Sequence, residues 1–286
     1  MPVTDFELYV YDNYLRAFEN KETLIQASAI ITEEAKKNIV QHIEKDKLEL
    51  WRVSYEQFVE YLKNKITMVA DNQIQIISSV EYHEKYGWTV SSKSGKAYLG
   101  KASIIDQLEI EIGNHSYCAG NSLLRGNGQL KIGSYTSIGW GLYIFVDYEN
   151  HPFQYAASIN FAVESRLVDD GLSLPIENVM ENKLNYVNIG NDVFIGRDVN
   201  IMNNVTIGDG CVIGAKSMVT KDCLPYGIYA GTPAKLIRMR FNDDMISQLK
   251  GIGWWNWSEE KIKDNELFFS TDLSCYKGDV SNLIVD

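Results

Sequence analysis

The chain has 286 residues, and its 45% hydrophobic content supports a folded core in one large domain or two smaller ones. Its formal net charge of −11 argues against nucleic acid or an anionic membrane as a partner. No apolar run approaches the roughly 20 residues that span a bilayer, and the first residues lack the basic and apolar regions of a signal peptide. We therefore expect a cytoplasmic protein.

Residues 1–100 predict a small N-terminal α+β domain. Two helices are expected, at 32–45 and 54–65, and a capping-box pattern begins the second. Residues 74–80 (IQIISSV) have the composition of a strand, and residues 86–96 predict a loop or hairpin.

Residues 101–241 predict a solenoid, because an apolar residue recurs at every sixth position. Residues 189–224 form six consecutive hexapeptides, each beginning with Ile or Val: Ile189, Ile195, Ile201, Ile207, Ile213 and Val219. Their fifth residues are small or β-branched: Val193, Val199, Val205, Cys211, Ser217 and Cys223. Neither the helical period of 3.6 nor the strand period of 2 gives this repeat, whereas a triangular coil of three hexapeptides does. Glycine often follows the aliphatic residue, which suits a tight turn.

Two earlier sets of hexapeptides are less regular and are offset by two residues. They begin at Ile112, Cys118 and Leu124 and at Ile132, Ile138 and Ile144. The pattern then stops over residues 146–186. An excursion of this length inside a regular solenoid is well above the usual loop length, and such loops are usually functional.

The four cysteines have no CxxC pair and no histidine at zinc-binding spacing, so free, buried thiols are expected. Cys211 and Cys223 occupy fifth positions, which favours a packing role. A local basic patch stands out against the acidic chain, with one acidic residue, Asp222, among five cations: Lys216, Lys221, Lys235, Arg238 and Arg240. Such a patch predicts a site for an anionic small ligand.

Residues 242–286 predict a C-terminal helical extension. One helix should begin at Asn242 or Asp243, and a second should have Ser258 as its N-cap. The tryptophan-rich turn between them (WWNW) predicts a packed cap over the end of the solenoid.

The segment from Leu123 to Asn265 resembles the xenobiotic acetyltransferase branch of the hexapeptide acyltransferases. This branch includes streptogramin and chloramphenicol acetyltransferases and is similar to several amino-sugar N-acyltransferases. The resemblance is carried by IGSYTSIGWG (132–141), NHPF (150–153), VFIGRDVNIMNNVTIGDGCVIGAKSMVTKD (193–222), YAGTPAKLIRMRF (229–241) and WWNW (254–257). It implies a left-handed parallel β-helix, acyl-CoA as cosubstrate without a metal, and a homotrimer.

The same resemblance assigns roles to individual residues. His151 corresponds to the catalytic base, and an imidazole can take a proton at neutral pH. Ala215 and Thr220 correspond to contacts with the pantetheine arm of CoA, and Lys221 to a contact with nearby polar groups. Lys235 and Arg238 correspond to residues that meet the nucleotide phosphates. Transfer is expected to be direct, without a covalent acyl-enzyme.

Three hypotheses about the activity remain open. The first is N-acyl transfer to the amine of a nucleotide-linked amino sugar in cell-surface glycan synthesis, such as that of lipopolysaccharide. Residues 1–100 would then provide a second binding surface; the alternative is that they only cover the open edge of the solenoid or extend the trimer contact. The second is an antibiotic O-acetyltransferase acting on a streptogramin or chloramphenicol. The third is a non-catalytic solenoid scaffold, which has no need of both His151 and the basic patch.

Overall fold

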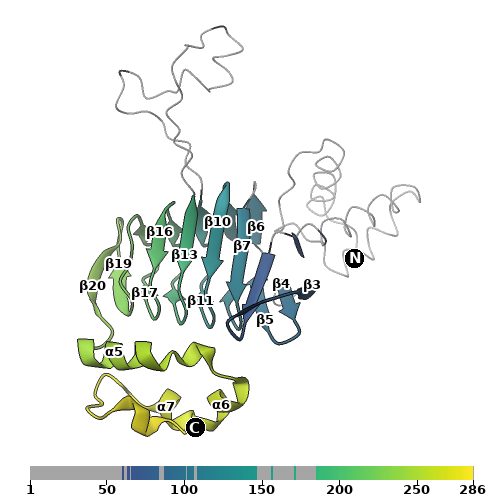
Figure 1. Ribbon diagram of the computed structural model, residues 1–286. Coiled ribbons are helices and arrows are strands. Elements are labelled where there is room, and N and C mark those ends of the chain that lie inside the picture. Colours follow the sequence, from purple (N-terminus) through teal and green to yellow (C-terminus); the bar gives the residue numbers. More distant parts are fainter. Residues whose placement is uncertain are drawn as a thin grey trace, which may run out of the picture.

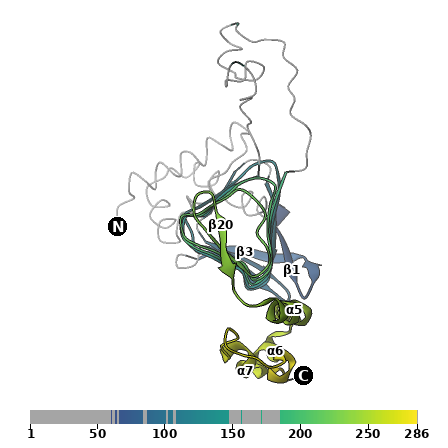
Figure 2. The ribbon, with the colours of Figure 1, turned by 90° about the vertical axis from the view of Figure 1, so that its left-hand side faces the viewer.

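The computed structural model describes residues 60, 63–64, 66–83, 87–100, 102–105, 108–146, 156, 171 and 185–285. Three mainly parallel β-sheets form the sides of a triangular prism, which is seen nearly end-on in Figure 2. Coil follows coil along the prism, and short helices lie along one edge (Figure 1). In the described part of the chain no helix is both long enough and apolar enough to cross a membrane.

Each side of the prism is one sheet. Sheet A contains β2 (Gln73–Gln75), β1 (Ile66–Ala70), β7 (Leu108–Gly113), β10 (Gly128–Ile132), β13 (Tyr186–Ile189) and β16 (Val205–Ile207). Sheet B contains β3 (Ile77–His83), β4 (Gly87–Ser92), β5 (Lys96–Gly100), β8 (Tyr117–Cys118), β11 (Ser137–Ile138), β14 (Phe194–Ile195), β17 (Val212–Ile213), β19 (Gly227–Ala230) and β20 (Lys235–Met239). Sheet C contains β6 (Ala102–Ile105), β9 (Ser122–Arg125), β12 (Tyr143–Phe145), β15 (Asn200–Ile201) and β18 (Met218–Val219).

The hexapeptide period is the geometry of this prism. Val187 pairs in parallel with Val205, and Phe194 with Val212, so one complete coil takes 18 residues. Leading and fifth-position residues both point inward: Ile189, Ile195, Ile201, Ile207, Ile213, Val219, Val193, Val199, Val205, Cys211, Ser217 and Cys223 are all buried. The predicted repeat and its apolar interior are confirmed.

The earlier coils are two residues longer, as the offset in the sequence indicates. Ser137 pairs with Tyr117 and Tyr143 with Leu123, a step of 20 residues in each case. The leading residues of these coils are also buried: Ile112, Cys118, Leu124, Ile132, Ile138 and Ile144.

In the first five hexapeptides from Ile189, the corners of the prism are turned by the fourth residue, which adopts a left-handed conformation. The φ angles are positive at successive fourth positions: Asp192 (52°), Asp198 (57°), Asn204 (57°), Gly210 (67°) and Lys216 (59°). Asp, Asn and Gly tolerate this conformation best.

The glycines that follow the aliphatic residues allow close approach between coils as well as the turn. A Cβ on Gly196 would lie 2.6 Å from the backbone nitrogen of Ala215 in the next coil. Gly208 also begins a corner turn, because its carbonyl oxygen accepts a hydrogen bond from Cys211 N at 3.2 Å, so the predicted turn role is confirmed at that position.

The parallel ladder begins about 35 residues before the expected domain boundary at residue 101. β1 pairs in parallel with β7, β5 with β8 and β6 with β9. Residues 66–100 therefore share the sheets of the solenoid. The expected strand at 74–80 is divided between β2 and β3, and the hairpin alternative for 86–96 is confirmed by the antiparallel pair β4–β5. The two expected helices lie outside the described residues, apart from helical Glu60, Lys63 and Asn64.

The C-terminal extension contains α5 (Asp243–Ile252), η2 (Trp254–Asn256), α6 (Glu259–Asp264), α7 (Glu266–Ser270) and η3 (Val280–Leu283). The side chain of Asn242 accepts a hydrogen bond from Met245 N, and Ser258 Oγ accepts one from Lys261 N. Both predicted N-caps are confirmed.

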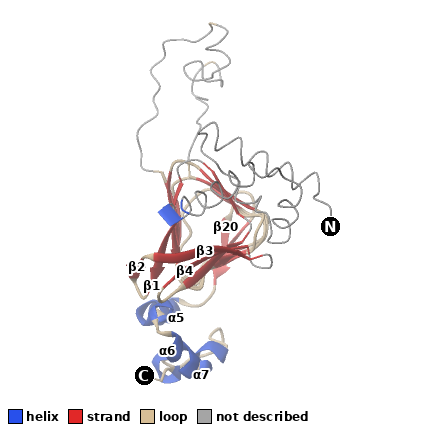
Figure 3. Ribbon diagram, turned by 90° about the vertical axis from the view of Figure 1, so that its right-hand side faces the viewer, coloured by secondary structure: helices blue, strands red, loops and turns tan. Residues whose placement is uncertain are grey.

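The extension does not close the end of the solenoid; it runs back along the corner between sheets A and B. Glu259 reaches His115 in an early coil, with 3.1 Å between carboxylate and imidazole. Trp254 packs on Tyr135 one coil later, with ring centroids 4.9 Å apart. The expected end cap is therefore wrong, and Figures 1 and 3 show the helices along one side of the prism.

Candidate functional site

The three corners of the prism are named by the sheets that they join. The AB corner contains residues 190–193 and 208–211, the BC corner residues 196–199 and 214–217, and the CA corner residues 202–204 and 220–222. The C-terminal helices contact the AB corner. The predicted site residues that the structure describes lie at the other two corners and on β20.

The excursion interrupts the CA corner, because β12 ends at Phe145 and the next strand among the described residues, β13, begins at Tyr186. Asparagine side chains form hydrogen bonds where the chain rejoins the prism at residue 185. Asn203 Nδ2 donates to Asn185 Oδ1 at 2.8 Å, and Asn185 Nδ2 donates to Asn127 O at 3.2 Å. His151 belongs to the excursion and lies outside the described residues, so its role stays a prediction.

Thr220 and Lys221 lie at the same corner as the excursion, but two coils further along the prism. The order β12–β15–β18 within sheet C sets this separation. Both side chains are exposed. The neighbouring Asp222 is engaged with the backbone, since its Oδ1 accepts a hydrogen bond from Thr206 N at 2.7 Å.

Ala215 lies at the BC corner, next to the loop 231–234 (GTPA), which folds onto the last strand of sheet C. Met218 N donates to Gly231 O at 3.0 Å, and Ala234 N donates to Met218 O at 2.8 Å. Thr232 Oγ1 donates to Lys216 O at 3.3 Å. These contacts place the beginning of β20 beside the corner that contains Ala215.

Lys235 and Arg238 belong to β20, the terminal strand of sheet B (Figure 1). β20 runs antiparallel to β19, with Lys235 opposite Ala230 and Arg238 opposite Ile228. Both side chains are exposed, and so are those of Lys216 and Lys221. Among the described residues none of these four cations forms an ion pair, although Arg238 Nη1 donates to Met239 O at 3.0 Å, so their charges can meet a ligand's phosphates.

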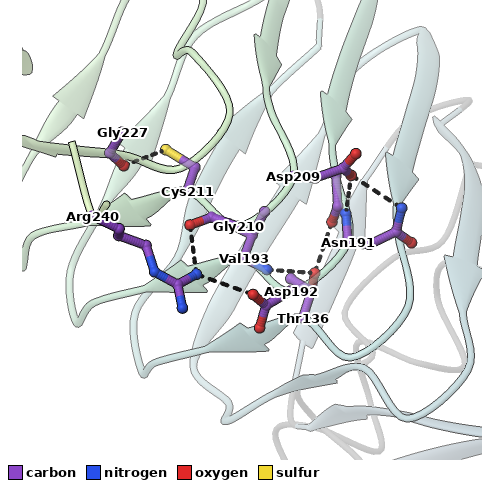
Figure 4. Close-up of polar contacts among 10 residues, drawn as sticks. Thr136, Asn191, Asp192, Val193, Asp209, Gly210, Cys211, Gly227 and Arg240 are labelled. Atoms are coloured by element: carbon purple, nitrogen blue, oxygen red, sulfur yellow. Dashed lines mark hydrogen bonds and ion pairs between the residues drawn. The ribbon is translucent and has the colours of Figure 1, made fainter. Parts of the chain in front are cut away.

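Arg240 has a different environment from the other cations of the patch. Its Nη1 lies 3.0 Å from Asp192 Oδ2 and donates to Gly210 O at 2.7 Å (Figure 4). Burial raises the pKa of Asp192 above its usual value, while the adjacent Arg240 opposes that shift. Arg240 is thus committed within the fold, and the expected patch retains four exposed cations.

Sheet C links the two corners that contain the predicted site. Tyr143 and Asn200 are paired on neighbouring strands of this sheet, and their side chains face outward. Tyr143 is 40% exposed, and Trp140 at the BC corner is 47% exposed. The sequence analysis did not select these two aromatics. The sequence could have indicated them, because both are large aromatic residues at hexapeptide positions that face outward, where small or polar residues predominate.

The cysteines do not provide a nucleophile at these corners. Cys118, Cys211 and Cys223 are free and buried, as expected, whereas Cys275 is exposed. Burial raises the pKa of the Cys118 thiol, and a hydrogen bond with Cys223 together with burial raises that of Cys211. Thiols with raised pKa values are poor nucleophiles at neutral pH.

Comparisons with known proteins agree with this architecture. Residues 186–221 match the family model described as bacterial transferase hexapeptide (six repeats). The chain is 42% identical over 136 residues to a chloramphenicol acetyltransferase of Klebsiella aerogenes, covering 47% of this chain and 63% of that protein. It is 56% identical over 77 residues to a probable macrolide acetyltransferase of Lysinibacillus sphaericus, covering 27% and 43%. The predicted resemblance is confirmed, over less than two thirds of these relatives.

A solved hexapeptide-repeat acetyltransferase of Vibrio cholerae, complexed with acetyl-CoA, is 25% identical with a TM-score of 0.36. That match covers 50% of this chain and 69% of the other.

Proposed function

We propose that this protein transfers an acetyl group from acetyl-CoA to a hydroxyl group of a small-molecule acceptor. The observation that carries the proposal is the 42% identity over 136 residues with a chloramphenicol acetyltransferase. The four exposed cations near the end of the prism support an anionic donor, because CoA has three phosphate groups.

The donor would occupy the last coils of the prism. Lys235 and Arg238 on β20 would hold the nucleotide phosphates, and Lys221 would meet nearby polar groups. The pantetheine arm would then pass Ala215 and Thr220, which lie at the two corners that bound β18. This path leads toward the corner from which the excursion containing His151 departs.

The chemistry would be direct transfer. His151 takes the proton of the acceptor hydroxyl as its oxygen attacks the thioester carbonyl, and a backbone N–H stabilises the resulting oxyanion. When the tetrahedral intermediate collapses, the carbon–sulfur bond breaks. The proton on His151 passes to the departing sulfur, which gives the acetylated acceptor and free CoA. No metal takes part in this scheme.

A second candidate acceptor is the amine of a nucleotide-linked amino sugar. The N-terminal segment favours it, because 65 residues precede the first described coil strand, which begins at Ile66, and they could provide a second binding surface. Fewer residues are available for such a surface than the expected 1–100, since the described residues from 66 to 100 are coil strands and hairpins. The similarity to chloramphenicol acetyltransferase favours the hydroxyl acceptor.

A CoA-release assay over a panel of acceptors tests the proposal. The panel contains chloramphenicol, a streptogramin, a macrolide, free amino sugars and nucleotide-linked amino sugars. We expect an antibiotic hydroxyl to exceed every sugar amine by at least about tenfold in kcat/KM, or roughly 1.4 kcal/mol. A tenfold preference for a nucleotide-linked amine would select the second candidate instead. Failure of CoA to raise the unfolding temperature, with no turnover, would favour the scaffold hypothesis.

A further inference from the structure

Strand β20 has little support of its own. It is the terminal strand of sheet B, and β19 is its sole partner strand in the described part of the chain. Its pairing with β19 is irregular between Ile228 and Tyr229. A terminal strand with a register shift needs additional contacts to hold its side chains in a fixed place.

Contacts at both ends supply this support. At the beginning, the backbone of Ala234 is bonded to Met218 of sheet C. At the end, Arg240 N donates to Tyr226 O at 2.8 Å, and the Arg240 guanidinium reaches the AB corner. Lys235 and Arg238 lie between these two attachments.

The Arg240 attachment joins two consecutive coils. Asp192 and Gly210 are equivalent fourth-position residues, one coil apart, and Arg240 Nη1 contacts the carboxylate of the first and the carbonyl of the second. The guanidinium also lies over two rings, 5.5 Å from the centroid of Tyr226 and 5.2 Å from that of Phe241. A planar guanidinium can satisfy all of these partners together, whereas an ammonium is a point charge with a shorter reach.

We propose that Arg240 is a positioning residue for donor binding: by clamping the end of β20 to Asp192 and Gly210, it holds Arg238 and Lys235 where they meet the donor's phosphates. This inference rests on the proposed function, because it presupposes an acyl-CoA donor. Arg240 itself does not touch the donor. Its role differs from that of the four exposed cations, although the sequence analysis placed all five in one basic patch.

The test uses Arg240→Lys and Asp192→Asn in the full chain, since both variants keep similar side-chain volumes. We expect each to raise the KM for acetyl-CoA about three- to tenfold, with kcat within about twofold of the wild type. The KM for acetyl-pantetheine, which lacks the nucleotide, should not change. Lys131→Met is the matched control, because it breaks another ion pair between neighbouring coils, Lys131–Glu111 at 3.1 Å, away from β20.

The outcomes separate this inference from the function on which it rests. A wild-type protein that neither binds nor uses acetyl-CoA would overturn both. A wild-type enzyme that is active, with Arg240→Lys showing an unchanged KM or an equal penalty for both donors, would overturn the positioning role alone. Unfolding of both variants below the assay temperature would show that Arg240 supports the whole fold, and would also overturn the assignment.

Discussion

His151 is the residue on which the chemistry depends most. Replacing it with Ala or Asn should lower kcat by roughly 10²–10⁴-fold, because a general base contributes about that much. The affinity for CoA should stay the same, since the described cations that would bind the donor lie on other elements. Steady-state kinetics together with calorimetric titration of CoA would measure both quantities. Near-normal turnover of the variant at pH 7 would remove His151 from the mechanism.

Lys235 and Arg238 should act on donor binding rather than on chemistry. Changing both to Ala should raise the KM for acetyl-CoA and leave kcat largely intact, because these cations contact the end of the donor away from the reacting carbon. Kinetics with acetyl-CoA and with acetyl-pantetheine would show the effect for the first donor alone. The matched control changes Lys250 and Lys277, exposed lysines of the C-terminal extension, to Ala. Equal penalties in the two double variants would indicate a general charge effect.

At the residue level, the sequence predicts which side chains are charged but not which of them are exposed and able to bind a ligand. Arg240 is one of five cations within a short segment, and no local pattern distinguishes it from Arg238. The distinction comes from Asp192, which is far away in sequence and adjacent only after the coils have stacked.

The hexapeptide is the element that the sequence predicts best. Every leading and fifth-position side chain in the regular coils faces inward, because a strict period leaves one arrangement that buries the aliphatic residues. The corner conformation was not predicted, because residue type does not mark it consistently: Asp, Asn and Gly tolerate it best, yet Lys216 adopts it and Asp222 does not.

The left-handed corner can be tested at Asn204, an exposed fourth-position residue with φ of 57°. Asn204→Val should lower the free energy of unfolding by about 1–2 kcal/mol, because a β-branched residue is strained at positive φ. Asn204→Gly should be neutral or slightly stabilising. Urea denaturation would measure both.

Asn200→Val is the control for that experiment, since Asn200 lies in extended strand β15, where valine is favourable. Equal destabilisation by valine at the two positions would contradict a conformational origin.

The first coils were missed for a physical reason. Ile66 pairs with Ile110, a step of 44 residues, and this stretch includes three antiparallel connections, β1–β2, β3–β4 and β4–β5, that hide the period. A repeat interrupted in this way cannot be recognised from spacing. The path of the C-terminal extension was missed for a related reason, since it depends on contacts of Trp254 and Glu259 with coils more than 100 residues earlier.

At the scale of the whole molecule, the resemblance to trimeric acetyltransferases predicts that His151 of one subunit faces CoA bound at another. Light scattering should then give the mass of a trimer. Co-expression of the His151→Ala chain with the Lys235→Ala, Arg238→Ala chain should restore activity at low acetyl-CoA, because mixed trimers contain some intact sites. A fully active monomer, or no restoration in mixed trimers, would contradict a shared site.

Transfer of an acyl group from CoA to a small acceptor is the activity that we propose for this protein. Mass spectrometry of an acceptor incubated with acetyl-CoA and the wild-type protein tests it most directly, with the His151→Ala protein as a parallel sample. We expect an acceptor that gains one acetyl group for each CoA released, with little product from the variant. Folded wild-type protein that gives no acetylated acceptor across the panel would contradict it.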